Sequence, residues 1–366
     1  MFQQFCVRAR YKRADLTARS EATVLCARAA CILSAFLIHR LRRMHMRRTL
    51  LSLMLASLAA QVGATGTLET KIWNRGAADC TTNRDPPIEV FEFDPGTFIL
   101  RQNRCLNFEA PFIYVMFGER TVFVQDTGAT AEPEKFPLYA EIRNLVSQRQ
   151  AGGSAPLQWL VTHSHSHSDH TAADGQFRGK ASVTLVEPTA SGVRGYFGFK
   201  DWPNGQATID LGNRKLTVLP IPGHQGESIA VYDEHTGWLL TGDTVYPGRL
   251  YVFDWDEYRS SVHRLAEFTR THRVSAVLGT HIEMSKSPGK DYPMGSRFQP
   301  DEAPLPLTVT ELGRLDQALQ EAGDDSEKIV MPKFIVTPIG WFQRTLSTVI
   351  GWFSSDYNQC PLSVLE

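Results

Sequence analysis

Residues 162–170 read Thr-His-Ser-His-Ser-His-Ser-Asp-His, so four of the 11 histidines in this 366-residue chain fall within eight positions. Imidazole side chains favour neither helix nor strand strongly, and backbone propensity therefore does not explain the cluster. A metal ion does explain it, because neutral imidazole and carboxylate are good ligands for zinc and neighbouring first-row ions. The segment predicts a metal site.

The spacing within this segment predicts that its side chains face two ions. An apolar strand expected over residues 157–162 would deliver the segment to a sheet edge, where residues two apart point the same way. His165 and His167 can therefore chelate one ion. Asp169 and His170 are adjacent in the sequence and can turn toward a second ion.

Three later residues are candidates for the remaining ligands. His224 follows Pro222-Gly223, Asp243 follows Thr241-Gly242, and His281 follows Gly279-Thr280. Each lies after an apolar, strand-like run and a small residue. A layered fold would bring such strand ends back to one place, so we expect these side chains to join the cluster.

The surrounding chain predicts a layered α/β domain, because strand-like and helical patterns are interspersed and no internal repeat interrupts them. Residues 111–125 have the pattern of a β-hairpin around Gly118-Glu119. Strands are expected at 89–93, 97–102, 111–117, 121–125, 157–162, 182–186, 215–221, 228–232, 238–241 and 274–278, and helices at 136–148, 256–271 and 306–322.

With these motifs in order, the sequence resembles the metallo-β-lactamase superfamily, whose signature is His-x-His-x-Asp-His followed by Gly-His, Gly-Asp and a final His. The resemblance spans about residues 88–285. It implies an αββα sandwich, in which two packed mixed β-sheets are flanked by helices and hold metals at one edge. We expect this domain to occupy residues 65–325.

The resemblance also implies a ligand set. It assigns the first metal to His165, His167 and His224, the second metal to Asp169, His170 and His281, and a bridging role to Asp243. Asp126, in Gln125-Asp-Thr-Gly128, matches an early family Asp that supports the site from behind its ligands. His163 is an additional imidazole, which we interpret as supporting or structural. The loop after His224 also departs from the family, reading Gln-Gly-Glu where many relatives have Thr-Pro-Gly.

Two zinc ions sharing a water would lower its pKa and polarise a carbonyl oxygen. We therefore expect a hydrolase in which a metal-bridging hydroxide, oriented by Asp169, attacks an ester, lactone, thioester or amide carbonyl of a small molecule. Tyr246 either reaches the substrate carbonyl, as a similarly placed lactonase tyrosine does, or packs in an aromatic-rich loop. Arg249 either binds an anionic substrate group or holds that loop.

Two other functions remain open at this point. A persulfide-dioxygenase-like enzyme would use one iron ion held by His165, His224 and Asp243. The complete second set of ligands argues against it, because one ion does not need them. A non-catalytic metal-binding protein of the cell envelope is the other alternative.

Charge separates a leader from the body of the chain. Residues 1–64 contain 11 basic and 2 acidic side chains, and the remaining 27 basic and 37 acidic side chains give residues 65–366 a net charge of −10. Such a body argues against nucleic acid as a ligand. Arg47-Arg48, the apolar run 50–60 and the small residues at 63–64 are typical of a signal peptide. A retained anchor is the alternative.

We therefore predict an exported protein, periplasmic or secreted, whose residues 1–43 reflect a start codon assigned too early or a second targeting element. Export would permit a disulfide between Cys80 and Cys105, leaving Cys360 over. The tail, residues 326–366, contains apolar residues at helical intervals from Trp341 to Phe353. It is expected to be a helix that packs on the domain, the alternative being a membrane-surface or dimer contact.

Overall fold

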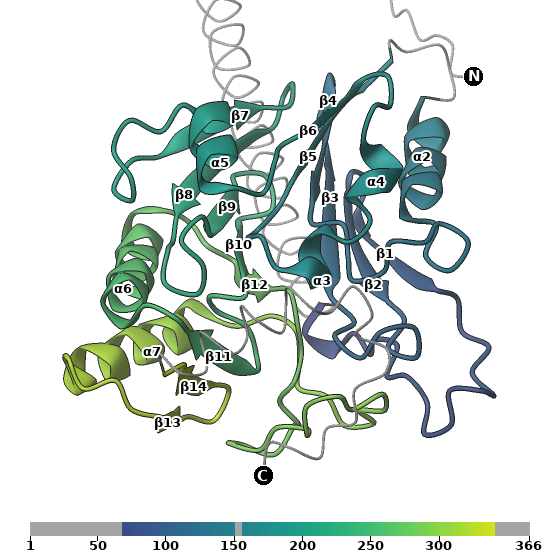
Figure 1. Ribbon diagram of the computed structural model, residues 1–366. Coiled ribbons are helices and arrows are strands. Elements are labelled where there is room, and N and C mark those ends of the chain that lie inside the picture. Colours follow the sequence, from purple (N-terminus) through teal and green to yellow (C-terminus); the bar gives the residue numbers. More distant parts are fainter. Residues whose placement is uncertain (1–67, 151–155, 341–366) are drawn as a thin grey trace, which may run out of the picture. The chain divides into compact units, whose positions relative to one another are not determined.

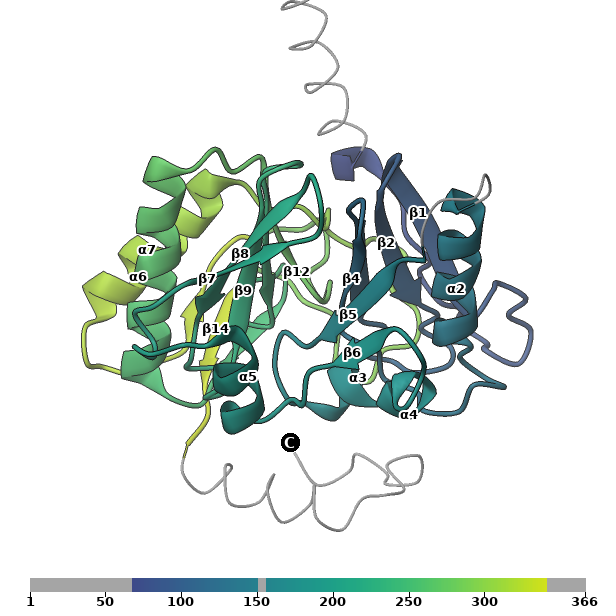
Figure 2. The same cartoon turned by 90° about the horizontal axis from the view of Figure 1, so that it is seen from above.

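The computed structural model describes residues 68–150 and 156–340, which form two mixed β-sheets packed face to face between outer helices (Figures 1 and 2). The predicted α/β class and αββα sandwich are confirmed. The first sheet has the order β1 (Ile88–Asp94), β2 (Thr97–Gln102), β3 (Phe112–Phe117), β4 (Thr121–Gln125), β5 (Gln158–Thr162) and β6 (Val183–Leu185). The second has the order β12 (Ala276–Gly279), β10 (Trp238–Gly242), β9 (Ile229–Asp233), β8 (Lys215–Pro220) and β7 (Ala207–Asp210).

Strand direction brings the ends of several strands to the same edge. In the first sheet β4 and β5 pair in parallel, in register from Thr121 opposite Gln158 to Gln125 opposite Thr162. In the second sheet β10 pairs in parallel with β12, and β9 is antiparallel to both β8 and β10. The carboxyl ends of β8, β10 and β12 therefore face one edge, as do those of β4 and β5.

The core between the sheets follows from residue alternation along the strands. On β3, Phe112, Tyr114 and Met116 pack toward the second sheet, while Ile113 and Val115 pack in a separate cluster with helix α2 (Leu138–Arg149). This period of two is expected for a strand with both faces covered. Full burial of each such side chain contributes about 1.5–3 kcal/mol.

Helices cover the outer face of each sheet. Figure 2 shows α2 outside the first sheet, and α6 (Trp255–Thr271) with α7 (Val309–Ala322) outside the second. The Asp254 carboxylate accepts a hydrogen bond from the Glu257 backbone N–H and so caps α6, the role expected of an Asp at a helix start. Thr308 and Glu311 form a capping box that begins α7. None of the helices within the described residues is both long and apolar enough to cross a bilayer.

Several elements differ from the sequence prediction. A third sheet, with the order β11 (Arg249–Val252), β14 (Ile335–Pro338) and β13 (Ile329–Val330), carries the described fold past residue 325. Residues 326–338 thus contribute strands where the sequence suggested the start of a tail. Helix α5 (Ala190–Phe197), the short α3 (Ser168–Thr171) and α4 (Asp174–Phe177), and strand β7 were also not predicted, because each is too short to show a clear period. The predicted leader, the tail helix from Trp341 and Cys360 lie outside the described residues.

The predicted disulfide between Cys80 and Cys105 is present, with the two Cα atoms 5.3 Å apart. Cys105 belongs to the loop 103–111, which joins β2 to β3. The backbone carbonyl of Glu109 in this loop lies 2.9 Å from His281 Nδ1. The bond therefore tethers a loop that contacts one of the predicted metal ligands.

We predict that the double variant Cys80→Ser/Cys105→Ser is less stable than the wild type by about 3–4 kcal/mol, because the bond closes a 25-residue span. Urea denaturation at neutral pH measures the loss. Tris(2-carboxyethyl)phosphine, a reductant without thiol groups to bind zinc, should destabilise the wild type comparably and leave the double variant unchanged. An equal effect of the reductant on both proteins would contradict a stabilising disulfide.

Candidate metal centre

The predicted metal ligands and Asp126 lie in segments that follow strand ends at the shared edge of the two sheets. The segment 163–170 follows β5, and Asp126 follows β4. His224 comes four residues after the end of β8, Asp243 follows β10 at once, and His281 comes two residues after β12. The fold thus gathers residues from five strands, as expected from the apolar runs that precede them.

Two glycines of the motifs are required by close packing. Gly223, just before His224, has a φ of 130°, and a Cβ there would lie 2.4 Å from the Tyr258 backbone at the start of α6. Gly242, just before Asp243, has a φ of 54°, and a Cβ there would lie 2.6 Å from Ser164 Cβ. Any larger residue would push the loop of His224 or of Asp243 away from the cluster.

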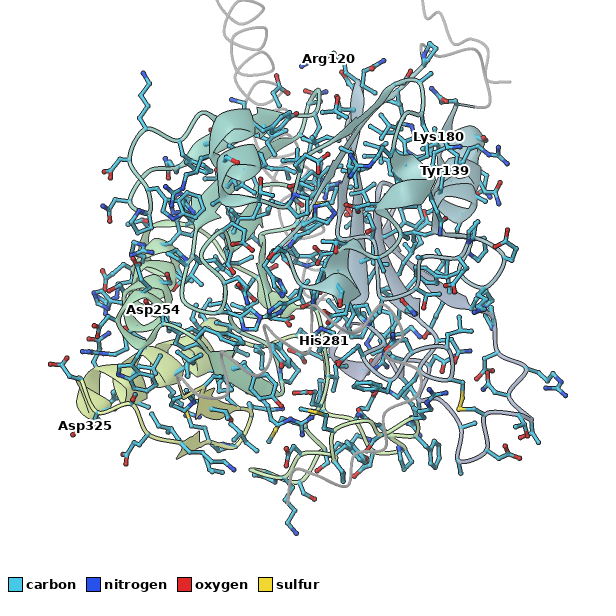
Figure 3. The ribbon with its side chains drawn as sticks, viewed as in Figure 1. Arg120, Tyr139, Lys180, Asp254, His281 and Asp325 are labelled. Carbon is cyan, nitrogen blue, oxygen red and sulfur yellow. A yellow bond between two sulfur atoms is a disulfide. The ribbon has the colours of Figure 1, made fainter. Side chains whose placement is uncertain are left out.

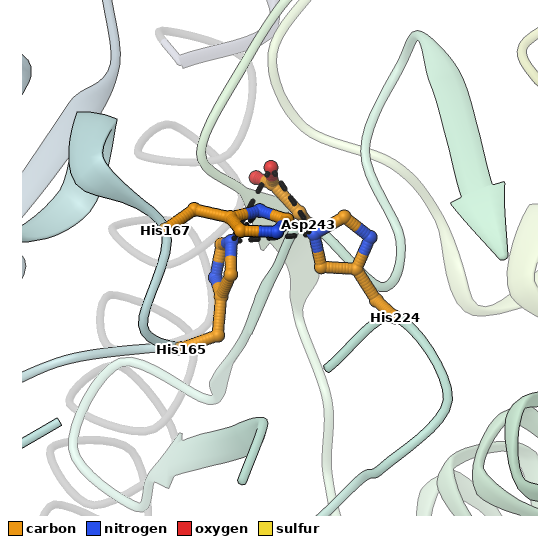
Figure 4. Close-up of side chains that lie close together, drawn as sticks. All are labelled: His165, His167, His224 and Asp243. Carbon is orange, nitrogen blue, oxygen red and sulfur yellow. Dashed lines mark hydrogen bonds and ion pairs between the residues drawn. The ribbon is translucent and has the colours of Figure 1, made fainter. Parts of the chain in front are cut away.

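The first cluster comprises His165, His167, His224 and Asp243, whose side chains converge in Figure 4. The facing ring nitrogens of the three histidines are 3.0–3.2 Å apart. Asp243 Oδ2 lies 3.8 Å from the Nε2 atoms of both His165 and His224. These four donors come from three different loops, so the chain fold alone brings them together.

The second cluster comprises Asp169, His170, Asp243 and His281. Asp169 Oδ2 lies 3.2 Å from His170 Nε2 and 3.3 Å from His281 Nε2. Asp243 contributes Oδ2 at 3.5 Å from His170 and Oδ1 at 3.4 Å from His281, the residue labelled near the centre of Figure 3. Asp243 is the member common to both clusters. All seven predicted ligands are therefore gathered.

The outward nitrogen of four of the five imidazoles is held by an acceptor outside the clusters. His170 Nδ1 donates to Asp126, His224 Nδ1 to the Tyr251 carbonyl and His281 Nδ1 to the Glu109 carbonyl, at 3.1, 2.8 and 2.9 Å. Ser164 Oγ lies 3.0 Å from His165 Nδ1. With the outer nitrogen protonated, each inner nitrogen presents a lone pair to the cluster.

The converging lone pairs and the buried carboxylates repel one another, and a bound metal ion would turn this repulsion into attraction. Three lone pairs of the first cluster face one another with no proton between them, an arrangement that a cation stabilises. Tetrahedral ligands bonded at about 2.0–2.1 Å stand roughly 3.3 Å apart, close to the observed spacing of the nitrogens. Within the described residues, Asp169 and Asp243 have no Lys or Arg partner, so their charges also call for a cation.

The pKa values of the cluster histidines also favour a metal ion. Burial lowers the pKa of His224 to about 4 and holds that of His165 well below its usual value, so both imidazoles are neutral. Burial also disfavours a charged His281, but the Asp243 and Asp169 carboxylates outweigh it and raise the pKa to about 9. The second cluster thus attracts positive charge. A proton on His281 supplies that charge here, and a bound metal ion could take its place.

Comparison with known proteins decides the family. Residues 106–281 match the model of the metallo-β-lactamase superfamily. Acyl-coenzyme A thioesterase MBLAC2 from Bos taurus is 38% identical over 206 residues, a match that covers 46% of this chain and 72% of that protein. The chain belongs to the metallo-β-lactamase superfamily. The predicted resemblance is confirmed, and the protein is a hydrolase of this fold with a His and Asp cluster able to bind metal.

Other superfamily members are similar over smaller parts or at lower identity. Hydroxyacylglutathione hydrolase from Dechloromonas aromatica (strain RCB) is 29% identical over 148 residues, covering 39% of this chain and 48% of that protein. A solved metallo-β-lactamase from Erythrobacter litoralis superposes with a TM-score of 0.44 at 16% identity, covering 65% of this chain and 99% of that one.

The loop that departs from the superfamily pattern contacts the His-x-His segment. The side-chain amide nitrogen of Gln225 is placed 2.5 Å from His167 Nε2, and Glu227 Oε1 accepts a hydrogen bond from the Ser166 backbone N–H at 3.1 Å. A half-turn of the amide about its last bond exchanges nitrogen and oxygen, and the oxygen can then accept from an N–H. With the oxygen toward His167 Nε2–H, the Nδ1 lone pair points into the first cluster. The sequence marked this loop as unusual but did not reveal these contacts.

Asp126 and His163 lie beside the two clusters and belong to neither. Asp126 accepts hydrogen bonds from the Ser164 backbone N–H at 2.6 Å, from Ser164 Oγ at 3.0 Å and from His170 Nδ1. Its φ of 72° is in the left-handed region, which Asp tolerates better than most residues. His163 Nε2 lies 2.8 Å from Asp174 Oδ1, and its ring is absent from both clusters.

Tyr246 and Arg249 belong to a polar network beside the second cluster. The Tyr246 hydroxyl contacts the Arg249 carbonyl and lies 3.1 Å from Glu283 Oε2. The Arg249 guanidinium binds Glu283 at 2.7 Å and Asp291 at 2.6 Å. These contacts favour the packing role for Tyr246 and the loop-holding role for Arg249. Glu283 was not singled out in the sequence, where nothing distinguishes it from a surface acid.

We predict that Gln225→Ala raises the zinc dissociation constant of the protein about 10- to 100-fold, because His167 loses the partner that orients its ring. Competition with a chromophoric chelator measures the constant. Gln225→Glu, which keeps an oxygen acceptor, should lose less. Gln176→Ala is the matched control, since that amide bonds the Phe136 carbonyl at 2.8 Å and touches neither cluster. Equal affinities in wild type and Gln225→Ala would rule out this role.

We predict that Tyr246→Phe changes kcat/KM by less than about threefold and costs about 1 kcal/mol of stability, the usual net value of one hydrogen bond. Steady-state kinetics and urea unfolding measure the two quantities. If the hydroxyl instead stabilised the developing oxyanion, its removal would lower kcat about 10²- to 10³-fold. A loss of that size would restore the catalytic role.

Proposed function

We propose that this protein is a dizinc hydrolase that cleaves a carboxylic thioester of a small molecule. The observation that carries the proposal is the pair of ligand clusters that share Asp243. Two adjacent clusters with a common carboxylate suit a pair of ions and one substrate carbonyl between them. Bound there, two divalent ions would lower the pKa of a water molecule toward neutrality and polarise a carbonyl oxygen.

The protein's own residues would supply position and proton handling. His165, His167 and His224 would hold one ion, Asp169, His170 and His281 the other, and Asp243 both. The Asp169 side chain is 20% exposed, whereas that of Asp243 is 9% exposed. Asp169 is therefore the carboxylate better placed to accept a hydrogen bond from the attacking water and orient it toward the carbonyl.

Two observations favour a thioester over an ester, lactone or amide: the substrates named for two relatives and the ease with which a thiolate leaves. Acyl-coenzyme A and hydroxyacylglutathione, the substrates in the names of two relatives, are both thioesters. A thiolate is also a good leaving group that needs no proton to depart. The described site contains Glu109 and Glu283 near His281 but no Lys or Arg free to bind a leaving anion there.

The mononuclear iron alternative is less well supported. It requires His165, His224 and Asp243 alone, and it leaves the convergence of Asp169, His170 and His281 without a purpose. The spacing of these three residues matches that of the first cluster. Metal content distinguishes the alternatives, since two zinc ions per chain favour hydrolysis and one iron ion favours oxygen chemistry.

We also propose that the enzyme is exported and acts on its substrate in an oxidising compartment. The Cys80–Cys105 disulfide supports this location, because such bonds persist outside the reducing cytosol. Arg47-Arg48 and the apolar run that follows support an export signal. A membrane-surface or dimer contact through the tail remains a proposal on residues 341–366, outside the described part.

We predict that Asp243→Ala reduces bound zinc from two ions per chain to at most one and lowers thioester hydrolysis at least about 10³-fold, because both clusters lose a ligand. Plasma emission spectrometry of purified protein and a thiol-release assay measure the two effects. His165→Ala should remove the first ion only. Chelation of the wild type should abolish activity, and added zinc should restore it.

The control for this experiment is His263→Ala, which removes an exposed imidazole paired with Asp316 on the outer helices. It should keep both ions and full activity. Full activity in an Asp243→Ala protein shown to contain no metal would refute the proposed function. Two ions without hydrolysis of any thioester, ester, lactone or amide would refute it equally.

A further inference from the structure

A groove opens from the first cluster between the segment that follows α5 and the start of α6. Its volume is about 710 Å³, within the roughly 300–1,000 Å³ of ligand pockets in general. Asp254, labelled in Figure 3, marks the end of the groove at α6. The groove is lined by His167, Arg194, Trp202, Pro222, Gly223, His224, Gln225, Gly226, Phe253, Asp254 and Glu257.

The inner end of this groove belongs to the candidate metal centre. His167 and His224, both in the first cluster, line it. The Phe253 ring lies 6.0 Å from the His167 ring and 5.8 Å from the His224 ring, measured between centroids. A molecule in the groove would therefore have one end at the first cluster.

The wall of the groove contains two aromatic rings, which form its apolar part beside polar and charged side chains. Trp202 and Phe253 are half-buried, so each presents part of its ring to the groove. Trp202 is held from behind by Phe199, at 5.4 Å between centroids. Pro222 and the two glycines beside His224 add surface without a polar side chain. Such walls favour an apolar occupant, since burying it removes apolar surface from water on both sides.

The charges around the groove do not suit an anion. Arg194 is its one cation, and the guanidinium lies over the Trp202 ring at 4.8 Å. Asp254 and Glu257 oppose it with two carboxylates, of which Asp254 also caps α6. The net formal charge of the lining, with neutral histidines, is −1. A phosphate group or a departing thiolate would be disfavoured at the α6 end of the groove, away from the metal ligands His167 and His224.

The opposite side of the centre offers little room. The cavity bounded by Glu109, Arg249 and Glu283 measures about 10 Å³. The Tyr246 ring packs on His281 at 5.6 Å between centroids. The bulky part of a substrate whose carbonyl lies at Asp243 must therefore extend into the groove or into solvent.

We propose that this groove binds the acyl group of the substrate, and that Trp202 and Phe253 select an apolar acyl chain. The inference rests on the proposed function, because it assigns binding positions to the acyl group and to the leaving group of the cleaved substrate. Cleavage generates negative charge on the leaving group, and the groove with its acidic rim is the poorer place for that charge. The uncharged acyl chain fits the two aromatic rings of the groove, and the leaving group extends into solvent, because the cavity beside the second cluster measures only about 10 Å³ and is itself lined by Glu109 and Glu283.

The test is a series of N-acetylcysteamine thioesters with straight acyl chains of two to eight carbons. For the zinc-loaded wild type we expect kcat/KM to rise about two- to fourfold per added methylene, the range that burial of one methylene supports. Trp202→Ala and Phe253→Ala should each flatten this dependence, so that the octanoyl-to-acetyl ratio falls at least tenfold. Trp202→Phe, which keeps an aromatic wall, should retain most of it.

Tyr196→Ala is the matched control, because Tyr196 is an exposed aromatic residue of α5 that does not line the groove. It should leave the chain-length dependence at the wild-type value. A flat dependence in the wild type would overturn the proposal, as would a steep dependence unchanged in Trp202→Ala and Phe253→Ala. A second series with one acyl group and longer alkyl thiols should show no such slope, and a slope there would assign the groove to the leaving group.

A binding measurement separates this inference from the proposed function. By isothermal titration calorimetry, octanoate should bind the zinc-loaded wild type at least tenfold more tightly than acetate does, and Trp202→Ala should remove that difference. Absence of hydrolysis would refute the proposed function and leave this result standing. Equal binding of octanoate and acetate by a wild type that hydrolyses thioesters would refute the acyl groove alone.

Discussion

The convergence of five imidazoles on the buried carboxylate of Asp243 is the constraint on which the rest of the structure depends. The Asp243 oxygens lie 3.4–3.8 Å from four of these imidazoles, and burying that charge without a cation is costly. Each inner nitrogen can receive a cation only if the outer one is held by an acceptor. Asp126, Ser164 and the carbonyls of Tyr251 and Glu109 are such acceptors. The loops that carry these acceptors must therefore lie where each acceptor can reach the outer nitrogen of its imidazole.

The sandwich supplies these positions because both sheets end at one edge. Hydrogen bonds between the sheets hold the edges in register: the Ile229 N–H donates to the Ser164 carbonyl, the Phe112 N–H to the Thr280 carbonyl, and the Tyr114 hydroxyl to the Gly279 carbonyl. Each links a strand or loop of one sheet to a ligand-bearing loop of the other. The close approach of Gly223 to α6 and of Gly242 to Ser164 explains why the motifs are Gly-His and Gly-Asp.

The sequence predicted those parts of the centre that depend on residue type and local spacing. His165, His167, Asp169 and His170 are recognisable because a strand edge and two-residue spacing impose their geometry. Partners such as the Glu109 and Tyr251 carbonyls could not be predicted, since a backbone oxygen leaves no trace in residue identity. The third sheet was missed for a related reason, because β13 and β14 are two and four residues long and show no period. Tyr246 remained ambiguous until Glu283, 37 residues away in sequence, was located beside it.

The proposed metal binding and the proposed substrate selection depend on different parts of this fold. The ligands follow strands whose ends are fixed by sheet pairing, whereas Arg194 and Trp202 lie in the segment between β6 and β7 that no ligand requires. Changes in that segment can alter the groove without moving the clusters. Gln225 is the exception, because its amide lines the groove and also contacts His167. A substitution there must both keep the contact with His167 and fit the wall of the groove.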